Sequence, residues 1–194
     1  MLKVAITGNI ASGKSFIGQT LKEKGYKVFD TDTISHSLLD ENKTILQEKF
    51  SGLDITEDDK ISRKKLGSLV FNDKNLKQRL ESVIHPMVEE KLKSIFETQK
   101  DNKAVFVEIP LLFETGMQKL FDKVILVYTQ DDVRKDRLKS RSNLSDEEIS
   151  KRFKSQMSQE DKIKMSDFVI DNTFSQERTK KELDEILKKL DIYV

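Results

Sequence analysis

One short segment near the N-terminus most constrains what this chain can fold into. Residues 8–15 read GNIASGKS, a complete match to the phosphate-binding loop pattern G-x-x-x-x-G-K-S/T. An apolar run with strand propensity, residues 2–7, precedes it, and a helical pattern, residues 16–24, follows it. This strand–loop–helix order distinguishes a working phosphate loop from a chance match, so we expect the chain to bind a nucleoside triphosphate.

The residue types in this loop suit the binding of an anion. Gly8 and Gly13 let the backbone turn so that successive N–H groups point at one anion. The helix that begins near Lys14 adds the positive end of its dipole. We expect Lys14 to reach the β- and γ-phosphates and the Ser15 hydroxyl to bind Mg²⁺.

Composition narrows the class of protein further. The length of 194 residues suits one α/β domain with an insertion, and a net charge of +1 argues against a dedicated nucleic-acid binder. The chain has no cysteine, which excludes a disulfide framework and a cysteine-based zinc site. No stretch approaches the about 20 apolar residues of a membrane span, and the first strand leaves no room for a signal peptide. We expect a cytoplasmic enzyme without nucleic-acid or membrane partners, and a monomer, although the sequence leaves a homo-oligomer open.

Five short apolar segments read as buried parallel strands, and helical patterns lie between most of them. This alternation is typical of a doubly wound α/β sheet. The gap between the second and third strands is too long for one crossover helix, so we expect an inserted helical subdomain there. Within it, Pro86 predicts a break or kink of the helix at His85, which would put this proline at the edge of an element. The five predicted strands are residues 2–7, 26–30, 104–108, 123–128 and 167–170.

A phosphate loop alone does not distinguish switches, motors and kinases. The D-x-x-G and N-K-x-D patterns of guanine-nucleotide switches are absent, and so is the L-S-G-G-Q pattern of transporter ATPases. What remains is a phosphate-loop core with two excursions. That layout suits a phosphoryl-transfer enzyme with one segment for the acceptor and one lid for ATP.

Carboxylates that follow the strands are candidates for the chemistry, because ligands of open α/β sheets bind where the strands end. Asp32 could accept the proton of an attacking hydroxyl, and we favour it over Asp30 because it lies further beyond the strand. Glu108 resembles a Walker B carboxylate that holds Mg²⁺ through water; the alternative is that it only caps its strand.

Basic residues of the second excursion are candidates for stabilising transferred charge. Arg137 and Arg141 are spaced to share one helix face, and guanidinium groups over the phosphates would stabilise the charge that develops during transfer. The alternative is that they are exposed surface charges. The two histidines, His36 and His85, are not spaced as a metal-binding pair.

Several separate blocks of residues, spread over nearly the whole chain, form a specific pattern through their order and spacing. The first blocks are the loop itself, DTDTISH at residues 30–36, residues 61–73, and IHP at residues 84–86. The later blocks are EIPLLFE at residues 108–114, Arg137 with Arg141, Arg152 with Gln156, Lys162, and residues 166–172. In this order and spacing, the blocks resemble the dephospho-coenzyme A kinase family.

The resemblance implies a fold and a reaction. The fold is that of P-loop nucleoside triphosphatases, an α/β fold with a doubly wound five-stranded parallel sheet of order 2-3-1-4-5. It implies one domain over residues 1–194, with a core at 1–32, 101–130 and 165–194. A helical acceptor insertion would occupy residues 33–100 and a helical lid residues 131–164. The reaction is the ATP-dependent phosphorylation of the ribose 3′-hydroxyl of dephospho-CoA, with Mg²⁺, to give coenzyme A and ADP in the last step of coenzyme A synthesis.

The resemblance also implies roles for individual residues. The catalytic residues would be Lys14, Asp32 and Arg141, and Mg²⁺ would be held by Ser15 and, through water, by Glu108. The ATP-binding residues would be Asn9, Ile10, Ala11, Ser12, Gly13, Lys14, Ser15, Phe16, Arg137 and Asn172, the last of them near the adenine. The dephospho-CoA-binding residues would be Asp32, His36, Arg63, His85, Pro86, Glu108 and Leu111.

Three departures and two alternatives accompany the resemblance. The glutamine that usually stands shortly before the lid arginine pair is absent, with Arg134 near its place, which affects only local contacts of the lid. Asn9 replaces a common glycine, which suggests a backbone conformation that asparagine, a residue less averse to positive φ, tolerates. Phe16 replaces a second hydroxyl residue, so a side-chain contact to the α-phosphate is lost. The alternatives are a nucleoside or nucleotide kinase of the same fold and a nucleotide-dependent switch module.

Overall fold

The computed structural model describes residues 1–142 and 144–193, which form two compact units. The first unit combines Met1–Asp30 with Thr98–Val194, and the second is Thr31–Glu97. The second unit starts slightly before the expected insertion, 33–100, because helix α2 begins directly after strand β2.

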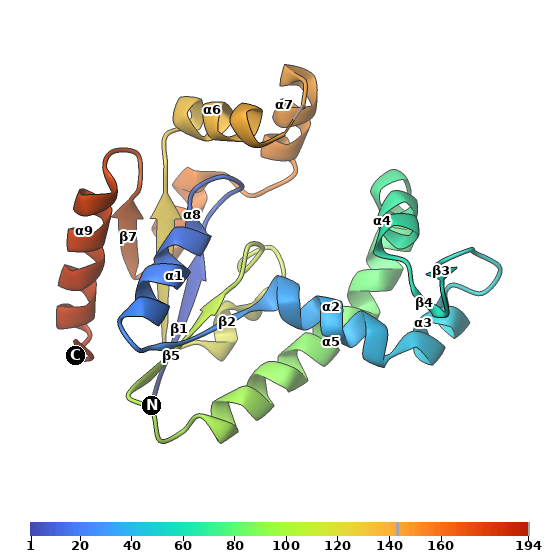
Figure 1. The fold of residues 1–194 in the computed structure, drawn as a ribbon, viewed down its shortest axis with the longest axis horizontal. Coiled ribbons are helices and arrows are strands. Elements are labelled where there is room, and N and C mark those ends of the chain that lie inside the picture. Colours follow the sequence, from blue (N-terminus) through green and yellow to red (C-terminus); the bar gives the residue numbers. More distant parts are fainter. Residues whose placement is uncertain (143, 194) are drawn as a thin grey trace. The chain divides into compact units, whose positions relative to one another are not determined.

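The first unit is built on a five-stranded parallel sheet in the order β2-β5-β1-β6-β7 (Figure 1). Counted along the chain within this sheet alone, the order is 2-3-1-4-5. The labels differ from that count because a two-stranded hairpin, β3–β4, lies between β2 and β5 in the sequence and was not expected. The five strands are β1 (Leu2–Thr7), β2 (Lys27–Asp30), β5 (Ala104–Glu108), β6 (Lys123–Tyr128) and β7 (Phe168–Asp171).

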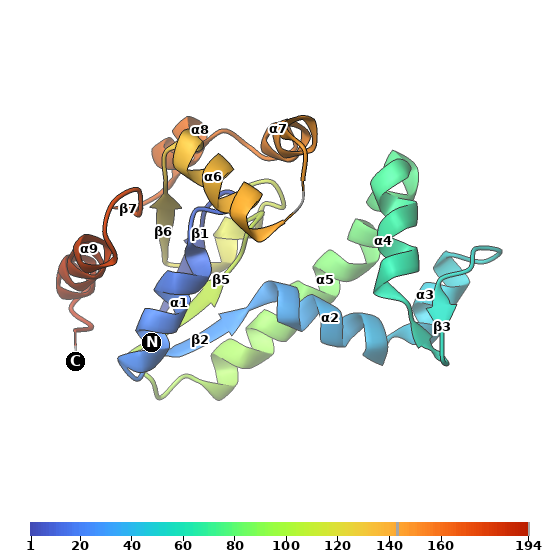
Figure 2. The ribbon, with the colours of Figure 1, turned by 45° about the horizontal axis from the view of Figure 1, so that its top comes forward.

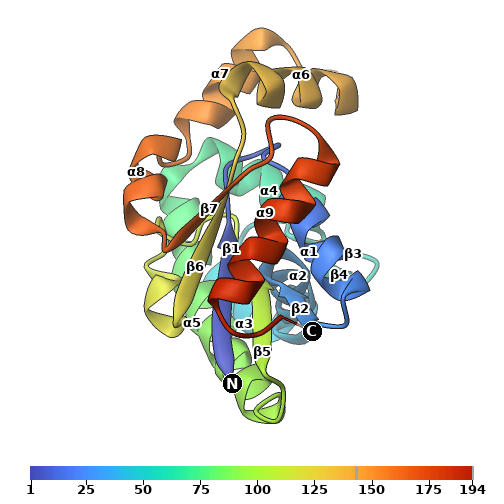
Figure 3. The same ribbon diagram turned by 90° about the vertical axis from the view of Figure 1, so that its left-hand side faces the viewer.

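Both faces of this sheet are buried, which is why its strands read as continuous apolar runs. Ile6, Phe106 and Ile125 belong to a core cluster with side chains of helices α1 (Lys14–Glu23) and α9 (Gln176–Lys189). Alternate residues of the same strands, Val105 and Leu126 among them, are also buried and point to the other face. Figure 3 shows α1 and α9 side by side on one face of the sheet.

Between β6 and β7, the described residues of the first unit form helices α6 (Asp131–Arg141), α7 (Asp146–Lys154) and α8 (Gln159–Met165) (Figure 2). At the start of α7, Ser145 and Glu148 form a capping box. α8 packs against β6. These helices occupy the expected lid segment, and their movement as a lid stays a prediction. A short 3₁₀ helix, η1 (Met117–Leu120), precedes β6.

The second unit is mostly helical. Its helices are α2 (Thr31–Glu41), α3 (Lys43–Lys49), α4 (Arg63–Asn72) and α5 (Lys74–Thr98), the last of which reaches the first residue of the other unit. The hairpin β3 (Thr56–Glu57) and β4 (Lys60–Ile61) joins α3 to α4.

Helix α5 corrects one prediction. It runs without interruption over 25 residues with Pro86 inside it, so the expected break at His85, and the placement of Pro86 at an element edge, are wrong. A proline inside a helix costs about 3 kcal/mol because it removes one backbone hydrogen bond and crowds the preceding turn. Buried apolar side chains continue on both sides of Pro86, and each contributes about 1.5–3 kcal/mol. Together these side chains stabilise the helix by more than the proline destabilises it. The buried residues of α5 are Val83, Ile84, Val88, Leu92 and Phe96.

Among the helices of the described residues, none is long and apolar enough to cross a membrane. The expected monomer and the expected cytoplasmic location stay predictions.

Candidate active site

The phosphate loop connects β1 to α1 and leaves the start of that helix without a side-chain cap. Gly13 is the N-cap residue of α1, with φ 95°, and it has no side chain that could cap this end of the helix. A Cβ atom at Gly13 would lie 2.1 Å from Nδ2 of Asn172, so both the backbone conformation and the space require glycine. The arrangement presents the positive end of the helix dipole to an anion.

The role expected for the backbone of Asn9 is wrong. Among the described residues, the loop position with positive φ other than glycine is Ala11, at φ 62°, and not Asn9. The Asn9 side chain is instead buried, and its Nδ2 donates to the Met157 carbonyl at 2.9 Å. Asparagine is used here for its side-chain donor rather than for its tolerance of positive φ.

Three consecutive residues begin α1. Lys14 Nζ donates to the Gly8 carbonyl at 2.8 Å, so its ammonium group lies over the loop. Ser15 is exposed. The Phe16 ring packs against the core cluster and its N–H donates to the Gly13 carbonyl at 3.0 Å.

The second half of the loop is held from outside by residues that are distant in sequence. The Ser12 carbonyl accepts from Thr129 Oγ1 at 2.9 Å and from Asn172 Nδ2 at 2.8 Å. The buried Asn172 also accepts from Thr179 Oγ1 at 3.0 Å. The Asn172 side chain therefore supports the loop directly, and its expected position near the adenine stays a prediction. Thr129, which was not predicted, is the first residue after β6.

The two expected arginines lie on α6, one turn apart. Arg137 donates to the Asn172 carbonyl at 2.8 Å and to the Ala11 carbonyl at 3.4 Å, which places its guanidinium group at the loop. Burial, and the charge of Arg141, lower the pKa of Arg137. Arg141 is exposed. One guanidinium group at the loop, with a second positive charge near it on the same helix, suits the binding of a polyanion.

A third arginine of α6 was not predicted to be part of the site. Arg134 is only 2% exposed, and it donates to the Asp131 carboxylate at 2.7 Å and to the Ile10 carbonyl at 3.4 Å. Its guanidinium carbon lies 4.1 Å from the centroid of the Phe153 ring. The sequence offers one indication that Arg134 is buried: it precedes Leu138 by one helical turn, so the two side chains share the buried face of α6.

Two carboxylates lie at the ends of neighbouring strands. Asp30 and Glu108 are register partners of β2 and β5, and Glu108 also pairs with Ile6 of β1. Glu108 is buried, and a Cβ atom at Gly18 would lie 1.9 Å from its Oε1. The Glu108 carboxylate is therefore packed against α1, one turn beyond Ser15.

Ser15 and Glu108 together could hold Mg²⁺, since Mg²⁺ in kinases is bound by one or two protein groups and by the phosphates of the nucleotide. Among the described residues there is no group of three or more His, Cys, Asp or Glu side chains that could hold a metal ion.

The residues expected at the acceptor lie mainly in the second unit. Asp32 and His36 are exposed and share one face of α2, and the next residue along that face, Asp40, lies 3.8 Å from the Arg63 guanidinium group. His85 and Pro86 are in the middle of α5. In the first unit, Leu111 is half-buried in the segment after β5. Their roles in binding stay predictions.

A phosphate loop on a parallel sheet of this order, with arginines of a following helix directed at the loop, defines a P-loop kinase. The family model for dephospho-CoA kinase matches residues 2–178 of this chain. The chain therefore belongs to the dephospho-CoA kinase family.

Individual relatives agree with the family model. The chain is 40% identical over 190 residues to a dephospho-CoA kinase of Helicobacter pylori, with 96% of each chain covered. A solved structure of a dephospho-CoA kinase from Campylobacter jejuni is 37% identical, with a TM-score of 0.77, over 97% of this chain and 96% of that one. A crystal structure from Thermus thermophilus is 34% identical, with a TM-score of 0.86, and the match covers 97% of both chains.

Proposed function

We propose that this enzyme transfers the γ-phosphoryl group of ATP to the ribose 3′-hydroxyl of dephospho-CoA, giving coenzyme A and ADP. The observation that carries the proposal is the phosphate loop, with Gly13, Lys14 and Ser15 at the start of α1, in a chain of the dephospho-CoA kinase family.

On the donor side, backbone N–H groups at the start of α1 and the Lys14 ammonium group would bind the phosphates. Lys14, which donates to the Gly8 carbonyl in this structure, would move to the β- and γ-phosphates. Mg²⁺, held by Ser15 and through water by Glu108, would neutralise charge on the phosphate oxygens. Arg141, with Arg137 behind it, would stabilise the charge that develops on the transferred group.

On the acceptor side, Asp32 would act as the base. The 3′-oxygen forms a bond to the γ-phosphorus, its proton passes to the Asp32 carboxylate, and the bond to the β–γ bridging oxygen breaks with its electron pair leaving on ADP. The exposed position of Asp32 in the first turn of α2 supports this role. The residues proposed to bind dephospho-CoA are His36, Arg63, His85, Pro86, Glu108 and Leu111.

The test is ADP release from Mg·ATP with and without dephospho-CoA. We expect ADP to form only with the acceptor, and a Lys14→Ala preparation, made in parallel, to reveal any contaminating kinase. AMP, CMP, dTMP and free nucleosides serve as competing acceptors. Faster ADP release with one of these acceptors than with dephospho-CoA would favour the nucleotide-kinase alternative. ADP release at the same rate with and without any acceptor would favour the switch alternative.

A further inference from the structure

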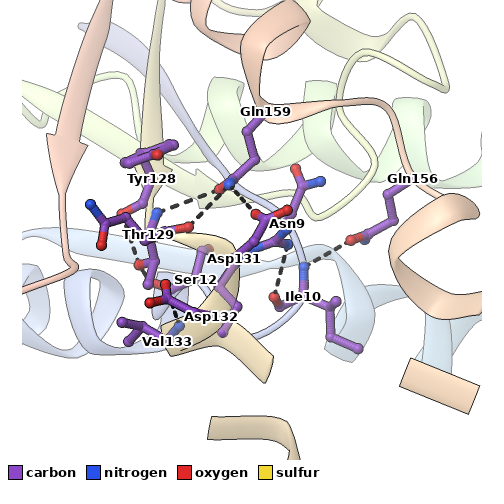
Figure 4. Close-up of polar contacts among 12 residues, drawn as sticks. Asn9, Ile10, Ser12, Tyr128, Thr129, Asp131, Asp132, Val133, Gln156 and Gln159 are labelled. Carbon is purple, nitrogen blue, oxygen red and sulfur yellow. Dashed lines mark hydrogen bonds and ion pairs between the residues drawn. The ribbon is translucent and has the colours of Figure 1, made fainter. Parts of the chain in front are cut away.

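The peptide groups around Ile10, in the first half of the phosphate loop, are held at both ends by side chains from the segment after β6. The Ile10 N–H donates to Gln156 Oε1 at 2.8 Å, and the Ile10 carbonyl accepts from Arg134 at 3.4 Å. Figure 4 shows the Gln156 amide pointing at Ile10. The neighbouring Asn9 side chain donates to the Met157 carbonyl at 2.9 Å.

The segment that carries Gln156 is itself fixed to the first unit. The Met157 N–H donates to Glu114 Oε1 at 3.0 Å. The same Glu114 oxygen lies 2.9 Å from Lys162 Nζ, whose side chain has 0% exposure. On the other side, Gln159 donates to the Thr129 carbonyl at 3.0 Å and to the Asp131 carboxylate at 2.9 Å (Figure 4). The residues that follow Gln156 are therefore tied to the first unit by several hydrogen bonds and an ion pair.

The orientation of the peptide groups around Ile10 matters for an anion site. Phosphate loops bind because several N–H groups converge, which requires each peptide plane to have a fixed orientation. Ala11, the next residue, has φ 62°, a conformation that costs an L-residue about 1–2 kcal/mol and persists only where the surroundings impose it. Bonds to Gln156 and Arg134 oppose rotation of the Ile10 peptide groups toward a relaxed conformation.

We propose that Gln156 is a positioning residue for the nucleotide: it sets the shape of the phosphate loop through the Ile10 N–H without itself contacting the phosphates. This role rests on the proposed function only in so far as the loop binds ATP. Loss of one neutral hydrogen bond corresponds to about two- to tenfold in affinity. The affinities for ATP and for ADP should fall together, because both place phosphates in the same cradle, and the affinity for dephospho-CoA should not change.

The test compares Gln156→Met, which keeps the length of the side chain but cannot accept from Ile10, with Gln156→Glu, which keeps an acceptor oxygen. A cavity of about 280 Å³ adjoins Gln156, so the substituted side chains have room. The matched control is Gln19→Met, because Gln19 is an exposed α1 residue that bonds to Glu23 on its own helix. The measurements are Kd for ADP, ATP and dephospho-CoA by calorimetry, kcat, Tm, and exchange of the Ile10 amide by NMR without nucleotide.

For Gln156→Met we expect ADP and ATP to bind about two- to tenfold more weakly, with kcat nearly unchanged, and the Ile10 amide to exchange about tenfold faster. Gln156→Glu should restore the slow exchange of the Ile10 amide, and Gln19→Met should match the unmodified protein in every measurement. Unchanged ADP and ATP affinities in Gln156→Met would overturn the proposal. Equal weakening of all three ligands together with a lower Tm would also overturn it, because it would indicate a merely structural role. ADP binding and amide exchange need no acceptor, so failure of phosphoryl transfer to dephospho-CoA would be distinguishable from failure of this inference.

Discussion

At the scale of single residues, the site depends on close approaches that a side chain would prevent. Gly18 has an ordinary helical backbone, yet a Cβ atom there would lie 1.9 Å from the Glu108 carboxylate. Gly67, in α4, has nothing within 4 Å of the same position. Of these two helical glycines, the packing around Gly18 requires the absence of a side chain, and the space around Gly67 does not.

We predict opposite effects of alanine at these two positions. Gly67→Ala should raise the free energy of unfolding by about 0.5–1 kcal/mol, because alanine favours a helix. Gly18→Ala should lower it by about 1–3 kcal/mol through overpacking, and should raise the Mg²⁺ concentration for half-maximal rate by displacing Glu108. Urea unfolding measures the change in stability of each variant, and a Mg²⁺ titration of the reaction rate measures the effect on Mg²⁺ dependence. Equal stability changes at the two sites would contradict the close packing of Glu108 on α1.

The Lys14→Ala variant should lose about 10²–10³-fold in kcat while its unfolding curve stays close to that of the unmodified protein. The reason is that an ammonium group directed at the transferred phosphate stabilises charge in the transition state. Lys22→Ala, an exposed lysine at the other end of the same helix, is the control. Near-normal turnover of Lys14→Ala would remove this lysine from the reaction.

The residues of the site differ in how far they can be predicted. The loop residues are consecutive in sequence, so a pattern identifies them. Arg134 and Gln159 cannot be found in this way, because they stand in a strongly charged stretch and their roles arise from contacts with Ile10 and Thr129, which are distant in the sequence.

At the scale of secondary structure elements, α5 shows how burial overrides a local signal. Pro86 is exposed in the middle of the helix, while the buried side of α5 continues past it. The hairpin β3–β4 was missed for a different reason, since each strand has two residues and shows no periodicity. Its turn residues Asp58 and Asp59 both have positive φ, at 47° and 61°, in a sequence without the glycine that usually marks such turns. The long apolar strands, in contrast, were predicted to within one residue.

We predict that Pro86→Ala raises the free energy of unfolding by about 1–3 kcal/mol, because it restores a backbone hydrogen bond inside α5. If Pro86 also contributes to the acceptor site, KM for dephospho-CoA should rise while KM for ATP stays constant. Urea unfolding and steady-state kinetics measure the two effects separately. A less stable variant would mean that the helix depends on the proline.

Helix α8 provides a second prediction at this scale. Lys162 is paired with Glu114 and its side chain is inaccessible, so Lys162→Met should lower the free energy of unfolding by about 1.5–3 kcal/mol by removing this charged hydrogen bond. Lys164→Met, on the same helix with a side chain 74% exposed, should change it by less than about 0.5 kcal/mol. Chemical unfolding of both variants tests the pairing, and similar losses in the two would contradict it.

At the scale of the whole molecule, the hydrogen bonds described above that hold the phosphate loop come from residues of the first unit, while most residues proposed to bind dephospho-CoA belong to the second. The sequence indicated that the chain has a separate helical part, because the gap between the second and third predicted strands is too long for one crossover helix. The order of the strands followed from the family resemblance, because strand patterns alone do not reveal which strands are neighbours.

This division predicts two separate footprints in hydrogen exchange. ADP should slow amide exchange at the junction of β1 and α1, because it binds the loop N–H groups. Dephospho-CoA alone should slow exchange in α2, α4 and α5. Mass-spectrometric exchange with each ligand in turn measures both footprints. Protection by dephospho-CoA confined to the first unit would contradict the proposed acceptor residues.

The most direct test of the central claim is the position of the transferred phosphate. The protein is incubated with Mg·ATP and dephospho-CoA, and the product is examined by mass spectrometry and by ³¹P–¹H correlation NMR. We predict a product heavier by one phosphate, whose new phosphorus couples to the ribose H3′. No new product, or a phosphate at any other position, would contradict the assignment of this chain as a 3′-hydroxyl kinase.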